Sequence, residues 1–363
     1  MFNIKKQINV LYITSVLGNL SITGAWVAIL SARGFSLVQI GFAETVFHIT
    51  SLMFEIPSGV FADVYGRKKM LLISNLMTVI GNMIMAFSGG FMWVCMSIAF
   101  HALGYNFASG SGDALAYDSL KLVGQERSFE KYVSNQSIIY RIANGISTLC
   151  AGFALFIGYK PAYLISAFTS MITLLITLGL REVKTDEVSV KNESVIKMVL
   201  AYFRESFSFP RSNGRAAKLM FANSMVGAVD ILLLFFLQSK LRSAGIADWT
   251  LGAALFVMEL GGIAGARIII RVEKIRYVWV FAVCTMGVAM GVMLEHTGLI
   301  PIMVIGGFLS AMADDALQIR TDARLNDMFP SWQRATLISI SSFIFSVVMI
   351  ILSPLAGFFF SMW

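Results

Sequence analysis

Four polar side chains that can carry or relay a proton follow one another at helical spacing in the second long apolar segment. Glu44, His48, Ser51 and Glu55 are separated by four, three and four residues, which places them along one narrow stripe of an α-helix. Histidine changes charge near neutral pH, and a buried carboxyl group can do the same. The stripe predicts a proton path. The alternative is a face buried for packing and gating, which Glu55 fits better because it lies beside a charged turn.

A further acidic residue, Asp230, lies near the middle of a later apolar segment, between Val229 and Ile231. A charge at the centre of a bilayer costs roughly 2.5–3.5 kcal/mol on insertion scales, so such residues are functional candidates. Asn223 shares the same helical face. The alternative role for Asp230 is an ion pair that holds two helices together.

The whole chain is strongly apolar. Of its 363 residues, 57% are hydrophobic and 13% are charged, whereas soluble domains carry about 25% charged residues. A spanning helix needs about 20 mostly apolar residues, so the sequence predicts an all-α integral membrane protein. Eleven segments qualify: Ile8–Leu30, Leu37–Phe61, Met70–Phe87, Phe91–Tyr117, Tyr132–Ile157, Ala162–Leu180, Ala216–Leu237, Trp249–Ile270, Tyr277–Leu294, Leu299–Leu317 and Ala335–Phe360.

No residue pattern indicates an enzyme. The sequence lacks a Ser/His/Asp arrangement, a phosphate-binding loop and metal-ligand spacing. Cys95, Cys150 and Cys284 are far apart in apolar segments, which is typical of small core residues. No cofactor or metal is expected.

Basic residues are distributed unequally between the two sides of the predicted membrane. With the N-terminus in the cytoplasm, only Arg33, Lys160, Lys240 and Arg242 fall outside. Cytoplasmic loops are normally the basic ones, so this orientation is expected. The same distribution explains the net charge of +7 without a nucleic-acid partner.

A polar interruption divides six predicted helices from five. We expect an N-terminal six-helix bundle at 1–180, a cytoplasmic linker at 181–215 and a C-terminal bundle of five helices at 216–363. Apolar residues recur at helical spacing within the linker and predict an amphipathic helix on the inner membrane face. They are Ile196, Val199, Leu200, Phe203 and Phe207.

The two bundles resemble each other weakly. Glu55 pairs with Glu259, and Arg67 with Arg271, at one constant offset of 204. This shared order predicts an internal parallel repeat. The second copy of the loop has Arg267 where the first has an acidic residue, so it is a degraded copy.

The turn between the second and third segments has the pattern Gly59-x3-Asp63-x2-Gly66-Arg67-Lys68. Gly59 is expected to let a neighbouring helix approach, and Gly66 to permit a tight reversal. The pattern resembles the loop between the second and third helices of the major facilitator superfamily. The resemblance implies a gate, in which the Asp and the Arg hold the two halves of a transporter together on the cytoplasmic side. The alternative is a charged turn that only obeys the positive-inside rule.

The resemblance implies roles for other residues, because the first, fourth, seventh and tenth helices of the family line a cavity. It places Asp230 beside the substrate and suggests Asp113 and Asp118 as partners of Arg67. Gate charges are expected in the tenth helix at Asp314, Asp315 and Arg320. Arg141 and Arg267 are candidate countercharges. The full set of cavity and proton-path candidates is Asn19, Trp26, Glu44, His48, Glu55, Asn106, Arg141, Asn223, Asp230 and Glu259.

Two features depart from the family pattern of six plus six helices. The chain ends at Trp363, just after the eleventh segment, so a twelfth helix is expected to be missing and the C-terminus to lie outside. The fifth helix reads Arg141-Ile-Ala-Asn-Gly145-Ile-Ser-Thr-Leu-Cys-Ala-Gly152. It lacks the proline of the antiporter motif Gly-x3-Gly-Pro-x2-Gly-Gly.

The expected function is secondary active transport by alternating access. Proton-coupled efflux of small amphipathic compounds, as in multidrug antiporters, is the first interpretation. An uptake or symport carrier is the second, and a non-transporting protein that kept the fold is the third. A channel lacks a recognisable filter or ring of like charges. The expected partners are a small-molecule substrate, a proton and the lipid of a bacterial cytoplasmic membrane, and the chain is expected to act as a monomer.

Overall fold

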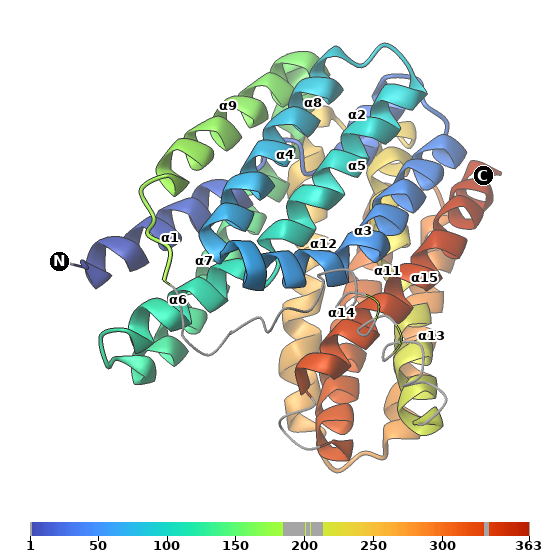
Figure 1. The fold of residues 1–363 in the computed structure, drawn as a ribbon. Helices are drawn as coiled ribbons and strands as arrows, with labels where there is room; N and C mark the ends of the chain where they lie inside the picture. The colour runs from blue at the N-terminus through green and yellow to red at the C-terminus, as the bar shows by residue number, and fades with distance from the viewer. Residues whose placement is uncertain (1, 184–199, 201–203, 205–212, 330–333, 363) are drawn as a thin grey trace. The chain divides into compact units, whose positions relative to one another are not determined.

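The computed structural model describes residues 2–183, 200, 204, 213–329 and 334–362, and every regular element in these ranges is helical (Figure 1). This confirms the predicted all-α class. The elements are α1 Ile4–Asn19, α2 Trp26–Ala32, α3 Leu37–Tyr65, α4 Arg67–Phe87, α5 Phe91–Ala108, α6 Ser111–Lys121, η1 Glu126–Ser128, α7 Phe129–Leu149, α8 Ala151–Ile157, α9 Tyr159–Thr177, α11 Gly214–Ser243, α12 Asp248–Arg271, α13 Tyr277–Glu295, α14 Ile300–Met328 and α15 Arg334–Ser361. The amphipathic helix predicted in the linker lies outside the described residues.

Among the described helices, nine are long and apolar enough to cross a membrane, or ten if the bent pair at 126–149 and 151–157 forms one span. The bent pair, at the fifth expected segment, accounts for the difference between nine and ten, and the first expected segment for the difference between ten and eleven. It is not one helix, because α1 and α2 are separate and each is shorter than the roughly 20 residues that spanning requires. The division into six and five spanning helices stays a prediction.

Hydroxyl groups explain why the first segment breaks. The Thr23 N–H donates to Ser21 Oγ at 3.2 Å, and the Ser21 N–H donates to Ser147 Oγ at 2.8 Å. Such side-chain bonds give the backbone an alternative to the helical ladder. The hydropathy of the segment is high enough for a span, but these local bonds end α1 at Asn19.

Contacts divide the chain into two compact units. Unit 1 comprises Met1–Gly24, Val46–Ser147 and Ile157–Phe203, and unit 2 comprises Ala25–Thr45, Thr148–Phe156 and Arg204–Trp363. The division at residues 180 and 216 that the sequence suggests stays a prediction. Each unit is a helix bundle with its own core.

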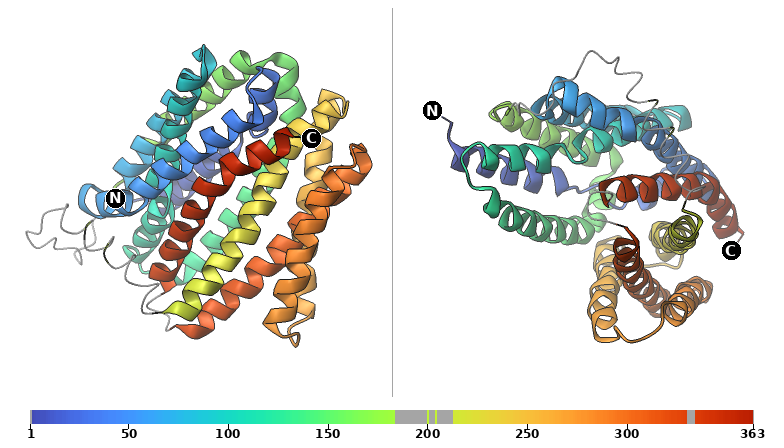
Figure 2. Two further views of the ribbon diagram at one scale, coloured as in Figure 1. Left: turned by 90° about the vertical axis from the view of Figure 1, so that its right-hand side faces the viewer. Right: turned by 60° about the horizontal axis from the view of Figure 1, so that its bottom comes forward.

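In unit 1, α4 packs against α5 and α9, and α1 packs against α6 and α9 (Figures 1 and 2). One core cluster brings together Leu11 of α1, Leu115 of α6, Tyr132 of α7 and Leu180, which follows α9. This cluster fixes the end of the bundle that carries the turn between α3 and α4.

In unit 2, α14 packs extensively against both α12 and α13 (Figure 2). α12 presents Gly261 and Gly265, one helical turn apart, to α14. A Cβ atom at either position would overlap a backbone carbonyl group of α14, that of Phe308 or Met312. Small residues at this spacing let membrane helices approach closely, and the close packing fixes the position of the polar residues on α14.

Gly265→Ala should destabilise unit 2, because the added methyl group would overlap the Met312 carbonyl group. Overpacking of this kind costs about 1–3 kcal/mol. Thermal unfolding of the detergent-solubilised protein would measure the loss. Gly59→Ala is the matched control, since a Cβ at Gly59 meets open space. Equal unfolding temperatures for the two variants would contradict the close packing of α12 on α14.

Candidate functional site

The turn between α3 and α4 is a single residue. α3 ends at Tyr65 and α4 begins at Arg67, and Gly66 between them has a φ of +102°. Residues with a side chain rarely adopt this conformation. The tight reversal predicted at Gly66 is confirmed.

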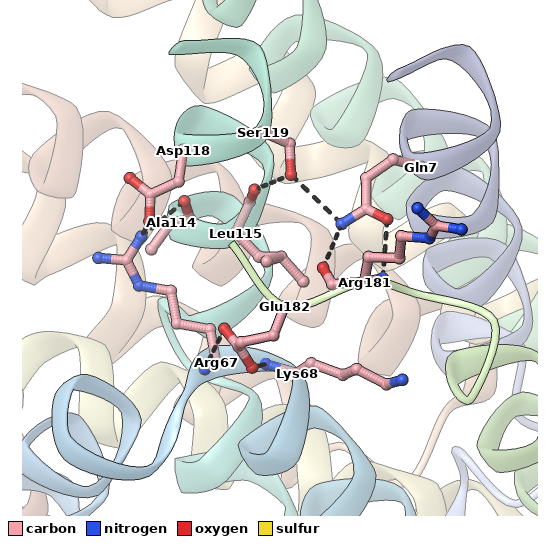
Figure 3. A network of polar contacts seen from close by, with 9 residues as sticks. All are labelled: Gln7, Arg67, Lys68, Ala114, Leu115, Asp118, Ser119, Arg181 and Glu182. Atoms are coloured by element: carbon pink, nitrogen blue, oxygen red, sulfur yellow. Dashed lines mark hydrogen bonds and ion pairs between the residues drawn. The ribbon is translucent and has the colours of Figure 1, made fainter. Parts of the chain in front are cut away.

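The side chain of Arg67 is tied to α6 (Figure 3). Its guanidinium group forms an ion pair with Asp118 and donates a hydrogen bond of 2.8 Å to the carbonyl oxygen of Ala114. Asp118 is only 5% exposed, and a buried carboxylate needs such a partner. The structure therefore brings Arg67 and Asp118 together, whereas Asp113 lies exposed in the first turn of α6.

Two residues that the sequence analysis did not single out complete this network, Gln7 and Glu182 (Figure 3). The Glu182 carboxylate accepts hydrogen bonds from the backbone N–H groups of Arg67 and Lys68 at 3.0 and 2.9 Å. One signal pointed to such a group, because a helix that begins with cations lacks the acidic residue that favours an N-terminus. That rule predicts an acidic partner but not its position in the sequence.

Other residues of the turn pattern behave differently from expectation. Gly59 is exposed, and a Cβ there would meet open space, so the close helix approach expected at this glycine is wrong. Asp63 is exposed two residues before α3 ends, and its gating role stays a prediction. The Lys68 ammonium group donates to the carbonyl oxygen of Leu178 at 2.9 Å, which ties α4 to the residues after α9.

The polar stripe of α3 is largely buried. Glu44, His48 and Ser51 are all below one-tenth exposed. Ser51 Oγ donates to the Asn106 side-chain oxygen at 2.9 Å, and the Asn106 amide donates back to the Ser51 carbonyl oxygen at 3.1 Å. These bonds join α3 to α5 and favour the packing interpretation for Ser51 and Asn106. The proton path through Glu44, His48 and Glu55 stays a prediction.

The other predicted cavity residues lie in separate local settings. The Asn19 amide donates to a carbonyl oxygen one turn earlier in α1, at 2.8 Å. The Trp26 ring packs edge-on against Phe235, with the ring centroids 5.6 Å apart. Glu259 accepts a hydrogen bond of 2.8 Å from the Thr148 hydroxyl group. None of these contacts distinguishes a cavity role from a packing role.

The buried acidic residue of unit 2 has an acidic neighbour. Asp230, 4% exposed in the middle of α11, lies within electrostatic reach of Asp314 and Asp315 of α14. One buried oxygen of Asp230 and one of Asp314 have no hydrogen-bond partner in the described part of the chain. Gly227 leaves room for this arrangement, since a Cβ there would lie 3.2 Å from Asp314 Oδ1.

The acidic pair belongs to a longer polar stripe. Ser310, Asp314, Gln318 and Asp322 recur every four residues along α14, which places them on one face of the helix. The Asn223 amide donates to the Gln318 side chain, whose own amide donates to both oxygens of Asp322 at 3.0 Å. Asn223, predicted on the face of Asp230, thus joins this stripe from α11.

The interpretation of Asp314 as a gate charge stays a prediction, but the helix boundary on which it was based is wrong. It assumed that the tenth segment ends at Leu317, whereas α14 continues to Met328. Asp314 therefore lies in the middle of its helix, beside Asp230. Arg320, also expected at the gate, donates to three carbonyl oxygens at and just beyond the C-terminal end of α12. The candidate countercharges Arg141 and Arg267 are exposed on α7 and α12.

Comparison with known proteins decides the family. A family profile described as Major Facilitator Superfamily matches residues 8–294. The chain belongs to the Major Facilitator Superfamily. It is 22% identical over 328 residues to the uncharacterised MFS-type transporter YxaM of Bacillus subtilis strain 168, which covers 87% of this chain and 79% of YxaM.

Solved structures show the same fold. The nucleoside transporter NupG superimposes with a TM-score of 0.72 at 15% identity, covering 99% of this chain and 96% of NupG. The D-xylose-proton symporter superimposes with a TM-score of 0.70 at 11% identity, covering 97% of this chain and 89% of the symporter. These likenesses show the fold, and the family match makes the protein a multi-pass membrane transporter of small molecules; the exporter subtype stays a prediction.

Arg67→Ala should destabilise unit 1, because Asp118 would remain buried without its cation. Leaving a buried charged acceptor unpaired costs about 1–3 kcal/mol. The double change Arg67→Ala with Asp118→Ala should cost less than the sum of the two single changes, as measured by thermal unfolding in detergent. Lys69→Ala serves as the control, since Lys69 is exposed in the same turn of α4. Additive effects at positions 67 and 118 would show that the pair is not energetically coupled.

Proposed function

We propose that this protein is a proton-coupled secondary transporter of the bacterial cytoplasmic membrane, working by alternating access. The observation that carries the proposal is the buried carboxyl pair of Asp230 and Asp314 in unit 2, with an unpartnered oxygen on each. The pair sits in the middle of two helices that qualify as membrane spans. A group that exchanges protons at that depth is what a proton-coupled carrier requires.

Electrostatics explains why a proton fits this pair. One carboxylate in mid-bilayer costs roughly 2.5–3.5 kcal/mol on insertion scales, and a second like charge adds repulsion. Three groups that lie near the pair in the described part of the chain are Ser310, Cys284 and Asp315, and none of these three carries a positive charge. A bound proton removes the repulsion without a cationic side chain. Release and rebinding of that proton would link the pair to a proton gradient.

The proposed gate lies in unit 1. The ion pair of Arg67 with Asp118 holds the α3–α4 turn against α6, and the turn pattern supports a gate because the family carries it between its second and third helices. The pair is accessible to water, with the Arg67 side chain 21% exposed. Opening the pair would leave the buried Asp118 carboxylate without its cation, which favours re-formation of the pair, as a cycling gate needs.

Unit 1 also supports an amphipathic substrate. Tyr105 of α5 and Tyr140 of α7 are 62% and 56% exposed near the middle of predicted spans. Glu55 of α3 lies within electrostatic reach of Tyr105, as does Tyr140. Aromatic rings beside a carboxylate attract organic cations that have an apolar part. Small amphipathic cations are therefore the proposed substrate class.

Efflux is the proposed direction. A cation and a proton would compete for the carboxylate of Glu55, and competition between two ligands for one group leads to their exchange rather than to transport together. The second candidate is uptake by symport, the activity in the name of the D-xylose-proton symporter, whose fold this chain shares. The sign of proton movement separates the two, because antiport and symport move protons in opposite directions relative to the substrate.

Proton flux in proteoliposomes tests the proposal. An inward gradient of a cationic amphipathic dye, tetraphenylphosphonium or ethidium, should drive protons out, as reported by a trapped pH indicator. Asp230→Asn or Asp314→Asn should remove at least about nine-tenths of this flux, since one carboxamide replaces a proton-binding group. Exchange of labelled dye across the membrane without a pH gradient should persist in both variants.

Asp248→Asn is the matched control, because Asp248 is an exposed carboxylate of the same unit, paired with Arg242. It should keep wild-type flux. Proton flux that survives Asp230→Asn and Asp314→Asn alike would overturn the proposed role of the pair. Proton movement in the same direction as the dye would overturn efflux in favour of symport.

A further inference from the structure

We propose that Glu182 is a positioning residue that holds Arg67 in register with Asp118, through a clasp formed by residues 180–183. This inference rests on the proposed function, in which the Arg67–Asp118 pair is the gate. The clasp follows α9 in the sequence and reaches α4 through hydrogen bonds (Figure 3).

The N-terminus of α4 has the wrong charges for a helix. The helix begins with Arg67, Lys68 and Lys69 and has no acidic residue in its first turn, and its N-cap Gly66 supplies no side-chain hydrogen bond. The N-terminal end of a helix carries a partial positive charge and unpaired N–H groups, which favour an anion. A cluster of cations there needs an external carboxylate.

Glu182 supplies this carboxylate. Its two oxygens accept hydrogen bonds from the backbone N–H groups of Arg67 and Lys68, at 3.0 and 2.9 Å. One carboxylate thus satisfies two of the unpaired donors of α4 and places a negative charge at its positive end. These charge-assisted hydrogen bonds hold the backbone of Arg67, whereas its side chain is held by other partners.

The clasp is itself anchored in unit 1. The Gln7 side chain accepts a hydrogen bond from the Arg181 N–H at 3.0 Å and donates one to the Arg181 carbonyl oxygen at 2.8 Å. The same amide donates to Ser119 Oγ of α6 at 3.2 Å. On either side, Leu180 and Val183 are 2% and 8% exposed and belong to the core cluster of unit 1. Glu182 therefore extends from a rigid support.

Gly66 and Glu182 fit one another. A Cβ atom at Gly66 would lie 2.6 Å from Glu182 Oε2, so an added methyl group would displace this carboxylate from its hydrogen bonds with α4. The glycine of the turn pattern is thus needed twice, once for its φ of +102° and once for the space that the carboxylate occupies. The space for the carboxylate links the turn to the clasp. A sequence pattern that covers only the turn does not reveal this link.

Arg67 consequently has two ties with different tasks. Its backbone N–H is held by Glu182, and its guanidinium group reaches Asp118 and the Ala114 carbonyl oxygen. With the backbone fixed, the side chain returns to the same partner each time the ion pair reforms. Without Glu182, the start of α4 would fray and the guanidinium group would find Asp118 less often.

A double-mutant cycle between positions 182 and 118 tests whether Glu182 acts by positioning Arg67 for its ion pair with Asp118. In proteoliposomes, Glu182→Ala should lower the kcat of substrate-driven proton flux by roughly tenfold, equal to about 1.4 kcal/mol, and leave KM within about twofold. In an Asp118→Asn background the same change should have little further effect, because the partner that Glu182 serves is gone. Glu182→Gln, which keeps one acceptor oxygen, should recover part of the rate. Glu130→Ala is the control, an exposed carboxylate in the first turn of α7.

Thermal unfolding in detergent provides a second readout that needs no transport. Gly66→Ala should be less damaging in a Glu182→Ala background than in the wild type, because one of its two costs has been removed. Independent effects of positions 182 and 118 on kcat, or of positions 66 and 182 on unfolding, would overturn the proposal. A wild-type protein that moves no protons would instead overturn the proposed function, and the unfolding cycle would still decide between a linked and an unlinked Glu182.

Discussion

A charge in an apolar bilayer must be paired, hydrogen-bonded or neutralised, and the described part of this chain meets that requirement in two different ways. In unit 1, Asp118 is paired with Arg67, and Glu182 is bonded to backbone N–H groups. In unit 2, Asp230 and Asp314 face each other across α11 and α14. The first arrangement is stable with both charges present. The second places two like charges side by side, and a bound proton would relieve their repulsion, which is why the proposed proton exchange is assigned to unit 2.

Glycines make room for three carboxylates, those of Glu182, Asp314 and Asp315. A Cβ at Gly66 would crowd Glu182, one at Gly227 would lie against Asp314, and one at Gly262 would overlap Asp315. In each case the glycine and the acid come from different segments of the chain. Close helix packing alone explains Gly261 and Gly265, which meet backbone atoms. Gly66, Gly227 and Gly262 differ from these two, because each lets an acidic side chain lie where a methyl group would otherwise be.

The features that could be predicted from the sequence are those set by residue periodicity and by local chemistry. Hydropathy located nearly all the helices, the φ of Gly66 followed from its place in a tight turn, and the pairing of Arg67 with Asp118 came from a resemblance to a known loop. Most contacts between segments far apart in the chain could not be predicted from the sequence. Nothing in the spacing of Glu182 indicates that it caps a helix 115 residues away. Asp314 was misplaced because a helix end was set too early, and the break after Asn19 was missed because hydropathy ignores hydroxyl–backbone bonds.

The two ties of Arg67 differ in how easily they break, and this difference suits a gate. The ion pair with Asp118 joins two side chains. Water can reach the Arg67 guanidinium group, whose side chain is 21% exposed, when the pair opens, whereas the buried Asp118 carboxylate favours re-formation of the pair. The bonds from Glu182 join a carboxylate to backbone donors that have no other partner within their helix. Breaking them would leave the start of α4 unsatisfied. In the proposed gate, the side-chain tie is the one that opens during a transport cycle, and the backbone tie is the one that makes it close on the same residue.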